Sequence, residues 1–168
     1  MTRSLSNTDG LDEADKRFLE QIKTVGWNVT NVLKRAGEVG PGWSFSCGIY
    51  FKFRHPEIAI FGLDSETRTQ VINNVGLAIQ NGKTFGIAEQ YGDIFERSLC
   101  TFRKVHESQY AEYLGWALWF YEGCEFPVLQ FFWPDKNGRY PWNEDCNSAV
   151  RQEQPLLFME REATDNVG

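Results

Sequence analysis

The chain has 168 residues, of which 42% are apolar and 15% aromatic, and it carries a net charge of −6. This length suits one domain with its own core. The acidic balance and the lack of a Lys/Arg run argue against nucleic-acid binding, and no apolar stretch approaches the roughly 18 residues of a membrane span. The four cysteines are too far apart to indicate a zinc site or a disulfide framework. We therefore expect a cytoplasmic protein without metal or cofactor, because the N-terminus also lacks an apolar signal core.

The first third of the chain predicts a helix, a strand and a loop in that order. Residues 1–8 are polar and we expect them to be disordered. Over residues 9–25, apolar side chains recur every three or four positions, which predicts an amphipathic helix capped near Asp9. Residues 27–33 alternate as a strand does, and the three glycines and one proline of residues 34–42 predict a loop.

The next segment predicts two strands at the middle of a sheet. Residues 43–52 alternate between apolar and polar side chains, which is typical of a half-buried strand, and Ser46 falls on the polar face. Residues 54–56 interrupt the pattern. Residues 57–63 form a nearly continuous apolar run, which favours a strand covered on both faces.

The second half alternates between helices and strands. A helix is predicted from Asp64 or Ser65 to Asn81, followed by a strand at residues 98–105 and a very apolar helix at residues 108–121 capped by Ser108. Residues 126–133 predict a strand, the Asn-Gly step at 137–138 a turn that returns the chain, and residues 143–154 a short helix. The prediction is a single α+β domain over residues 9–158, with a mostly antiparallel sheet of about five strands, three packed helices and a flexible tail at 159–168.

One candidate site lies at the end of the central strand pair. Ser46, His55 and Glu57 are the residue types of a nucleophile, a base and an orienting carboxylate, so a small hydrolase is one interpretation. Tyr50 and Arg54 lie beside them in the sequence and are candidate binding residues. The competing interpretation is structural: a histidine before proline in a tight turn commonly satisfies backbone groups, and Glu57 then pairs with Arg54. The spacing of these residues does not establish a catalytic triad.

A second candidate site, which we call the aromatic turn, surrounds the Asn-Gly step at residues 137–138. Its members are aromatic, amide and charged residues of the kinds that often carry binding energy at interfaces or line a ligand pocket, namely Gln130, Trp133, Asp135, Arg139, Tyr140 and Trp142. The structural alternative is a folded-back hairpin in which both tryptophans pack on the core and Asp135 caps the turn.

Two sets of motifs carry a family resemblance that extends from about residue 26 to residue 158. The first is an aromatic and a small polar residue, a glycine and then His-Pro-Glu, found here as Phe45, Ser46, Gly48, His55, Pro56 and Glu57. The second has Phe-Pro, then Gln before Trp-Pro-Asp, then Gly, an aromatic residue, Pro and Trp, found here as Phe126, Pro127, Gln130, Trp133, Pro134, Asp135, Gly138, Tyr140, Pro141 and Trp142. In these motifs the chain resembles the domain-of-unknown-function 4262 family of bacterial proteins, from which it departs at Cys47 and Ile49. The resemblance implies no activity.

The function that the sequence favours is a non-enzymatic protein-binding module. Acidic charge, abundant aromatic residues and the lack of a convincing catalytic set support it, and the charge favours a partner with a basic surface. By analogy, small acidic bacterial proteins include immunity proteins that neutralise a toxin by covering it. The alternatives are a small hydrolase at Ser46, His55 and Glu57, and a small-ligand sensor at the aromatic turn.

Overall fold

The computed structural model describes residues 1–34, 36–96 and 98–162. Within these ranges it contains one six-stranded sheet, six α-helices and one short 3-10 helix. The strands are β1 (Asn28–Val32), β2 (Trp43–Cys47), β3 (Glu57–Phe61), β4 (Gln90–Tyr91), β5 (Cys100–Lys104) and β6 (Val128–Phe132). The helices are α1 (Glu13–Thr24), α2 (Ile49–Phe53), α3 (Ser65–Gln80), η1 (Glu107–Gln109), α4 (Tyr110–Tyr113), α5 (Gly115–Tyr121) and α6 (Ser148–Glu153).

The sheet has the strand order β1-β2-β3-β6-β5-β4. The β3–β6 pair is parallel and the other four pairs are antiparallel, which confirms the α+β class and the mostly antiparallel sheet. The predicted central position of β2 and β3 is also correct. The predicted counts of five strands and three helices are too low, because β4, α2 and α4 are too short to produce a periodic pattern.

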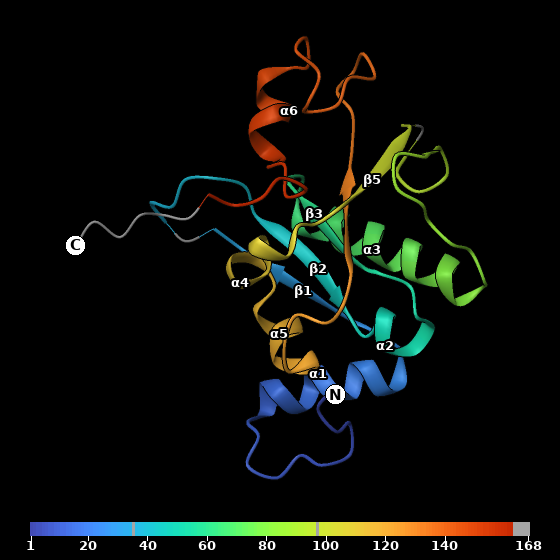
Figure 1. Cartoon of the computed structure of the whole chain (residues 1–168), viewed down its shortest axis with the longest axis vertical. Coiled ribbons are helices and arrows are strands. Elements are labelled where there is room, and N and C mark those ends of the chain that lie inside the picture. Colours follow the sequence, from blue (N-terminus) through green and yellow to red (C-terminus); the bar gives the residue numbers. More distant parts are fainter. Residues whose placement is uncertain (35, 97, 163–168) are drawn as a thin grey trace.

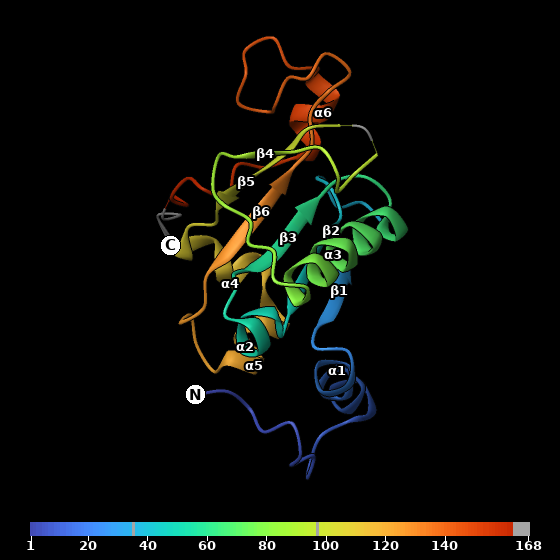
Figure 2. The same ribbon diagram turned by 90° about the vertical axis from the view of Figure 1, so that its right-hand side faces the viewer.

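Helices cover both faces of the sheet (Figures 1 and 2). On one face α3 packs over the sheet around Ile58, Ile60 and Phe131. On the other face α1, α4 and α5 enclose a second apolar cluster around Phe45 and Phe120. Because helices cover both faces, Ser46 is completely buried, its hydroxyl bonding to Glu57 and to the Ile58 N–H, and β2 is not the half-buried strand that the alternation predicted.

The strand predicted over residues 43–52 ends early. β2 stops at Cys47, and Gly48 adopts φ +115° before α2 begins at Ile49. A side chain at Gly48 would place its Cβ 2.7 Å from the carbonyl oxygen of Gly26. Only glycine suits this conformation and this close approach, so the chain leaves the sheet here and turns into a helix.

The helix predicted over residues 108–121 is also divided. Its first turn is η1, capped by the side chain of His106 in place of the predicted Ser108. α4 then ends at Tyr113, because the φ and ψ of Leu114, −121° and 39°, are not helical. α1 likewise begins later than predicted, with Asp12 and not Asp9 as its cap. By contrast α3 begins at the predicted cap, because the Asp64 carboxylate accepts from the Thr67 N–H at 2.7 Å.

The two ends of the chain were predicted to lie outside the domain. Within residues 1–8, Arg3 donates its backbone N–H to the Phe120 carbonyl at 2.9 Å and its Nε to the Trp119 carbonyl at 2.8 Å, both on α5. Most of the predicted tail, residues 163–168, lies outside the described residues. None of the described helices combines the length and the apolar character that a membrane crossing requires.

Candidate functional site

The carboxylate of Glu57, at the start of β3, is the centre of a buried polar cluster. Ser46 donates its hydroxyl to Oε2 at 2.5 Å. The backbone N–H groups of Gly48 and Tyr50 donate to Oε1 at 2.7 and 3.1 Å, and the Tyr121 hydroxyl donates to the same oxygen. Glu57 thus satisfies the first N–H groups of α2, which that short helix cannot satisfy itself.

The burial of this cluster sets its electrostatics. Glu57 is 1% exposed and Ser46 is 0% exposed. Burial raises the pKa of Glu57, and the hydrogen bonds from Ser46, Tyr121, Tyr50 and Gly48 oppose that rise. Burial and the nearby Glu57 carboxylate also raise the pKa of the Tyr121 hydroxyl. A hydroxyl and a carboxyl enclosed in this way are in position to hold α2 against the sheet, and they are closed to a substrate.

His55 does not complete a catalytic set with these residues. Its Nε2 accepts from the Phe85 N–H at 3.0 Å, so Nδ1 is the nitrogen that donates to the Pro56 carbonyl, at 2.9 Å. Burial lowers the pKa of His55, which favours this neutral ring. Both ring nitrogens are therefore used by backbone groups, as the structural interpretation predicted. That interpretation was wrong about Glu57, which bonds to the cluster above and not to Arg54.

Three residues of the aromatic turn hold chain segments together. Gln130 is 0% exposed and bonds through its amide to the Pro155 carbonyl and the Leu157 N–H. The Trp133 indole donates to the Phe61 carbonyl at 2.9 Å. Asp135 accepts the N–H groups of Asn137, Arg139 and Asn147, and these bonds lower its pKa. Asp135 thus caps the turn, as the structural alternative predicted, and its backbone N–H donates to the Arg139 carbonyl at 2.8 Å, although the described residues after the turn form no strand.

The other three residues of the turn pack beside this loop. Tyr140 donates its hydroxyl to the Leu99 carbonyl at 2.7 Å and stacks on Trp142. Trp142 also meets the edge of Phe132 and lies under the guanidinium of Arg103 at 4.6 Å. Arg139 forms an ion pair with Asp145. The six residues are close in space, yet most of their polar atoms are engaged within the chain.

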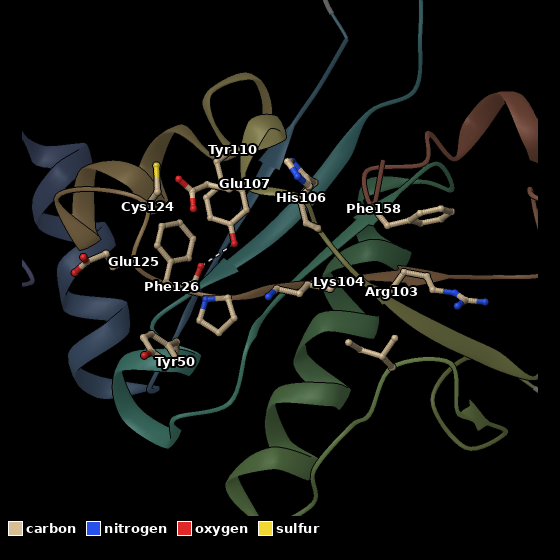
Figure 3. A pocket seen from close by; sticks show the side chains of 13 residues that line it. Tyr50, Arg103, Lys104, His106, Glu107, Tyr110, Cys124, Glu125, Phe126 and Phe158 are labelled. Carbon is tan, nitrogen blue, oxygen red and sulfur yellow. Dashed lines mark hydrogen bonds between the residues drawn. The ribbon is translucent and has the colours of Figure 1, made fainter. Parts of the chain in front are cut away.

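An open cleft of about 690 Å³ lies between α2, the end of β5 and the segment that enters β6, and two of its lining residues, Arg103 and Phe158, contact Trp142. Its lining includes four aromatic residues, of which Tyr50 and Phe158 are partly exposed and Tyr110 and Phe126 are buried. Tyr110 is fixed by its hydroxyl, which donates to the Phe126 carbonyl at 2.7 Å (Figure 3). The aromatic surface of the cleft is therefore rigid on the side of α4.

Charged side chains line the same cleft. Figure 3 shows Lys104 facing Tyr50, Tyr110 and Phe126, whereas Arg103 points away from them. Glu107 lies beside Tyr110, and Glu125 is directed outward. Lys104 is exposed and forms no ion pair or hydrogen bond through its ammonium group with any residue that the structure describes. The cleft thus combines an aromatic wall with an unpaired cation.

The cleft includes one residue of the first candidate site and touches a second. Tyr50 lines it, and the guanidinium of Arg54 lies 5.5 Å from the Tyr50 ring centroid. The aromatic turn lies at the other end of the sheet, as Figure 1 shows from the positions of α2 and α6, so the two candidate groups do not form one site. Lys104, Tyr110 and Phe126 were not predicted as site residues. No sequence pattern indicates that the end of β5 lies beside the entry to β6.

The described residues contain no group of three or more His, Cys, Asp and Glu side chains arranged to hold a metal ion. Cys47, Cys100 and Cys146 are buried, and burial raises the pKa of each thiol. Cys124 is exposed and lies in the cleft.

Comparison with known proteins gives one result. A search of curated proteins and a search of solved structures each found no match. A family model matches residues 21–147, which include β1 to β6, the Glu57 cluster and most of the cleft, but not Phe158. The match covers more than half of the chain and agrees with the resemblance seen in the motifs. The chain therefore belongs to the DUF4262 family, a domain of unknown function.

Proposed function

We propose that the protein is a non-enzymatic binding module that engages a protein partner through the cleft between Tyr50 and Lys104. The observation that carries the proposal is the contrast in exposure: the cleft presents the partly exposed rings of Tyr50 and Phe158 and the unpaired ammonium of Lys104, while Ser46 and Glu57 are enclosed and fully bonded. Aromatic anchors beside a charge are typical of binding surfaces. The hydrolase alternative would require Ser46 to become exposed and His55 to leave its two backbone partners.

The charges suggest how a partner approaches and binds. The net charge of −6 favours the approach of a protein with a basic surface. Within the cleft, Lys104 favours an acidic or carbonyl group on the segment that enters, and the partly exposed Tyr50 ring favours an apolar side chain next to it. Covering a toxin, as immunity proteins do, is one role that such binding would serve.

The test is a quantitative capture of partners from lysate of the source cells. Three tagged proteins are used: the wild type, Lys104→Glu and Lys52→Glu. Lys104→Glu places a negative charge in the cleft. Lys52→Glu makes the same charge change on the exposed face of α2, outside the residues that line the cleft. We expect one stoichiometric partner with the wild type and with Lys52→Glu, and about tenfold less of it with Lys104→Glu.

Alkylation of the Cys124 thiol provides a second measurement on the same complex. Cys124 lines the cleft and the other three cysteines are buried, so a thiol reagent should modify Cys124 first in the native protein. A partner in the cleft should slow that reaction. Equal capture by both variants, together with unchanged alkylation of Cys124 in the complex, would refute binding at the cleft.

A small ligand is the second candidate, because the volume of the cleft lies in the range of small-molecule sites. In that case the purified protein should release a heat-stable compound on denaturation, and Lys104→Glu should release much less of it than Lys52→Glu.

A further inference from the structure

The two edges of the sheet differ in length and protection. β4 forms one edge and has only two residues, whereas β1 forms the other edge and has five. The sequence of β1 is Asn-Val-Thr-Asn-Val, which contains no charged residue and no proline. Natural sheets usually protect a long edge with charge, proline or a covering segment, because its unpaired backbone groups can pair with another chain. The edge at β1 lacks the first two of these protections.

The register shows which backbone groups of β1 face outward. Gly62 donates its N–H to the Gly42 carbonyl, so even-numbered residues of β2 direct their backbone groups toward β3. The odd-numbered residues of β2 then pair with Asn28, Thr30 and Val32. The remaining two residues of β1, Val29 and Asn31, direct their N–H and C=O groups away from the sheet. No described residue forms a hydrogen bond with these four groups.

Both faces of this edge are hollowed. On the α3 side, a hollow of about 560 Å³ is lined by Asn31 and by polar residues of α3 that include Glu66 and Thr69. On the α1 side, a hollow of about 450 Å³ is lined by residues 28–31 of β1 and by Arg17 and Trp116. Successive side chains of a strand point to opposite faces. An added strand would therefore place alternate side chains in these two hollows.

The hollows differ in charge. Arg17 belongs to the α1 side and Glu66 to the α3 side, and neither forms an ion pair with any residue in the described part of the chain. Exposed apolar side chains lie just beyond both ends of β1, since Val25 is 51% and Leu33 is 66% exposed. These features favour an extended segment with one acidic side chain directed toward α1 and no other charge.

We propose that the outer edge of β1 is a second interaction site, at which an extended segment of a partner protein with an acidic side chain facing Arg17 adds to the sheet as a seventh strand. The backbone groups of Val29 and Asn31 supply the main-chain hydrogen bonds, and the two hollows receive the side chains. This is peptide recognition by strand addition. The site is independent of the cleft at Lys104.

The probe is an acetylated heptapeptide, Thr-Val-Thr-Glu-Thr-Val-Thr, titrated into the isotope-labelled protein and followed by NMR. Two further peptides carry N-methyl groups on complementary sets of alternate amides, so that each blocks only one edge of the peptide. We expect the Val29 and Asn31 amides to shift and to become protected from hydrogen exchange. One N-methylated peptide should bind like the parent and the other should not bind, because a strand pairs through one edge only.

Variants of the protein separate the backbone contribution from the charge. Val29→Pro removes one outward N–H and should weaken binding about tenfold, whereas Val29→Thr retains it and should bind like the wild type. Replacing the glutamate of the peptide by glutamine should weaken binding three- to fivefold. Arg17→Glu should abolish that preference, while Lys23→Glu, on the same helix but outside the hollow, should preserve it. Lys104→Glu should change none of these results.

Three outcomes would overturn the proposal. The first is no shift at Val29 and Asn31 at millimolar peptide. The second is equal binding of the two N-methylated peptides, which would show that main-chain pairing is not involved. The third is a dimer in sedimentation that Val29→Pro, but not Val29→Thr, converts to a monomer, which would assign the edge to a second copy of this chain.

Discussion

The Glu57 cluster and the cleft lie on the two sides of α2. The charged group of the cluster is buried and fully hydrogen-bonded, whereas that of the cleft is exposed and has no partner among the described residues. Inside, the backbone N–H of Tyr50 donates to a carboxylate that has four hydrogen-bond donors and is closed to solvent. Outside, the Tyr50 ring lines a cleft in which the Lys104 ammonium has no partner among the described residues. Glu57, which the sequence indicated as a catalytic candidate, thus stabilises the fold. Lys104, which no motif indicated, is available for binding.

Removing the carboxylate should have the largest effect. Glu57→Ala leaves the donors of Ser46, Gly48, Tyr50 and Tyr121 without an acceptor in the interior, and we expect the free energy of unfolding to fall by about 3–5 kcal/mol. Urea denaturation measures this loss. Glu57→Gln keeps one acceptor oxygen and a similar volume, so its loss should be smaller, about 1–2 kcal/mol. A Glu57→Ala protein as stable as the wild type would mean that the cluster is not structural.

The turn between β2 and α2 should be nearly as sensitive. Gly48→Ala introduces a Cβ at φ +115° and 2.7 Å from the Gly26 carbonyl oxygen, so we expect a loss of about 2–4 kcal/mol. Gly115→Ala is the matched control, because a Cβ there meets nothing within 4 Å and α5 begins at that residue. Thermal unfolding should leave Gly115→Ala within about 1 kcal/mol of the wild type. Equal losses for both would exclude the close approach as the cause.

His55 should contribute less to stability, and its contribution should depend on pH. His55→Ala leaves the Phe85 N–H without its acceptor, which costs about 2 kcal/mol at neutral pH. Burial lowers the folded-state pKa of His55 from 6.5, so the unfolded chain binds the proton first as the pH falls. The stability that His55 provides is therefore present above pH 6.5 and is lost below it, as the pH falls through the folded-state pKa.

Urea denaturation of the wild type and of His55→Ala between pH 8 and pH 5 measures this difference. The two curves should converge toward low pH. A constant gap would show that the ring does not titrate on unfolding. A catalytic role for His55 would be indicated by loss of a measured turnover in a variant that keeps its stability.

Substitution in the cleft should have the smallest effect on stability. Lys104→Glu changes an exposed side chain without an internal partner, so the free energy of unfolding should stay within about 0.5 kcal/mol of the wild type, as it should for Lys52→Glu. If Lys104→Glu unfolded the protein, lost binding would no longer identify a binding surface. Together with Glu57→Ala, this variant separates the residues that hold the fold from those available to a partner.

Local pattern by itself determined much of the fold. The Asp64 cap and the apolar stripe that follows it predicted α3 closely, since capping and helical periodicity depend on residues within a few turns of each other. The continuous apolar run at residues 57–63 correctly predicted a strand buried on both faces. The His-Pro turn and the motifs around Gln130 and Asp135 likewise indicated the family that the family model then matched.

The tertiary structure alone decided what these residues do. Glu57 and Tyr121 bond although they are 64 positions apart, and Lys104 lines the same cleft as Tyr50 only because β5 ends beside the segment that enters β6. The exposed edge at β1 follows in the same way from the strand order. Strand order and the packing of helices on a sheet depend on contacts between distant segments, and the spacing of residues along one segment does not encode them. For that reason the sequence could name Ser46, His55 and Glu57 as candidates but could not reveal that they are enclosed.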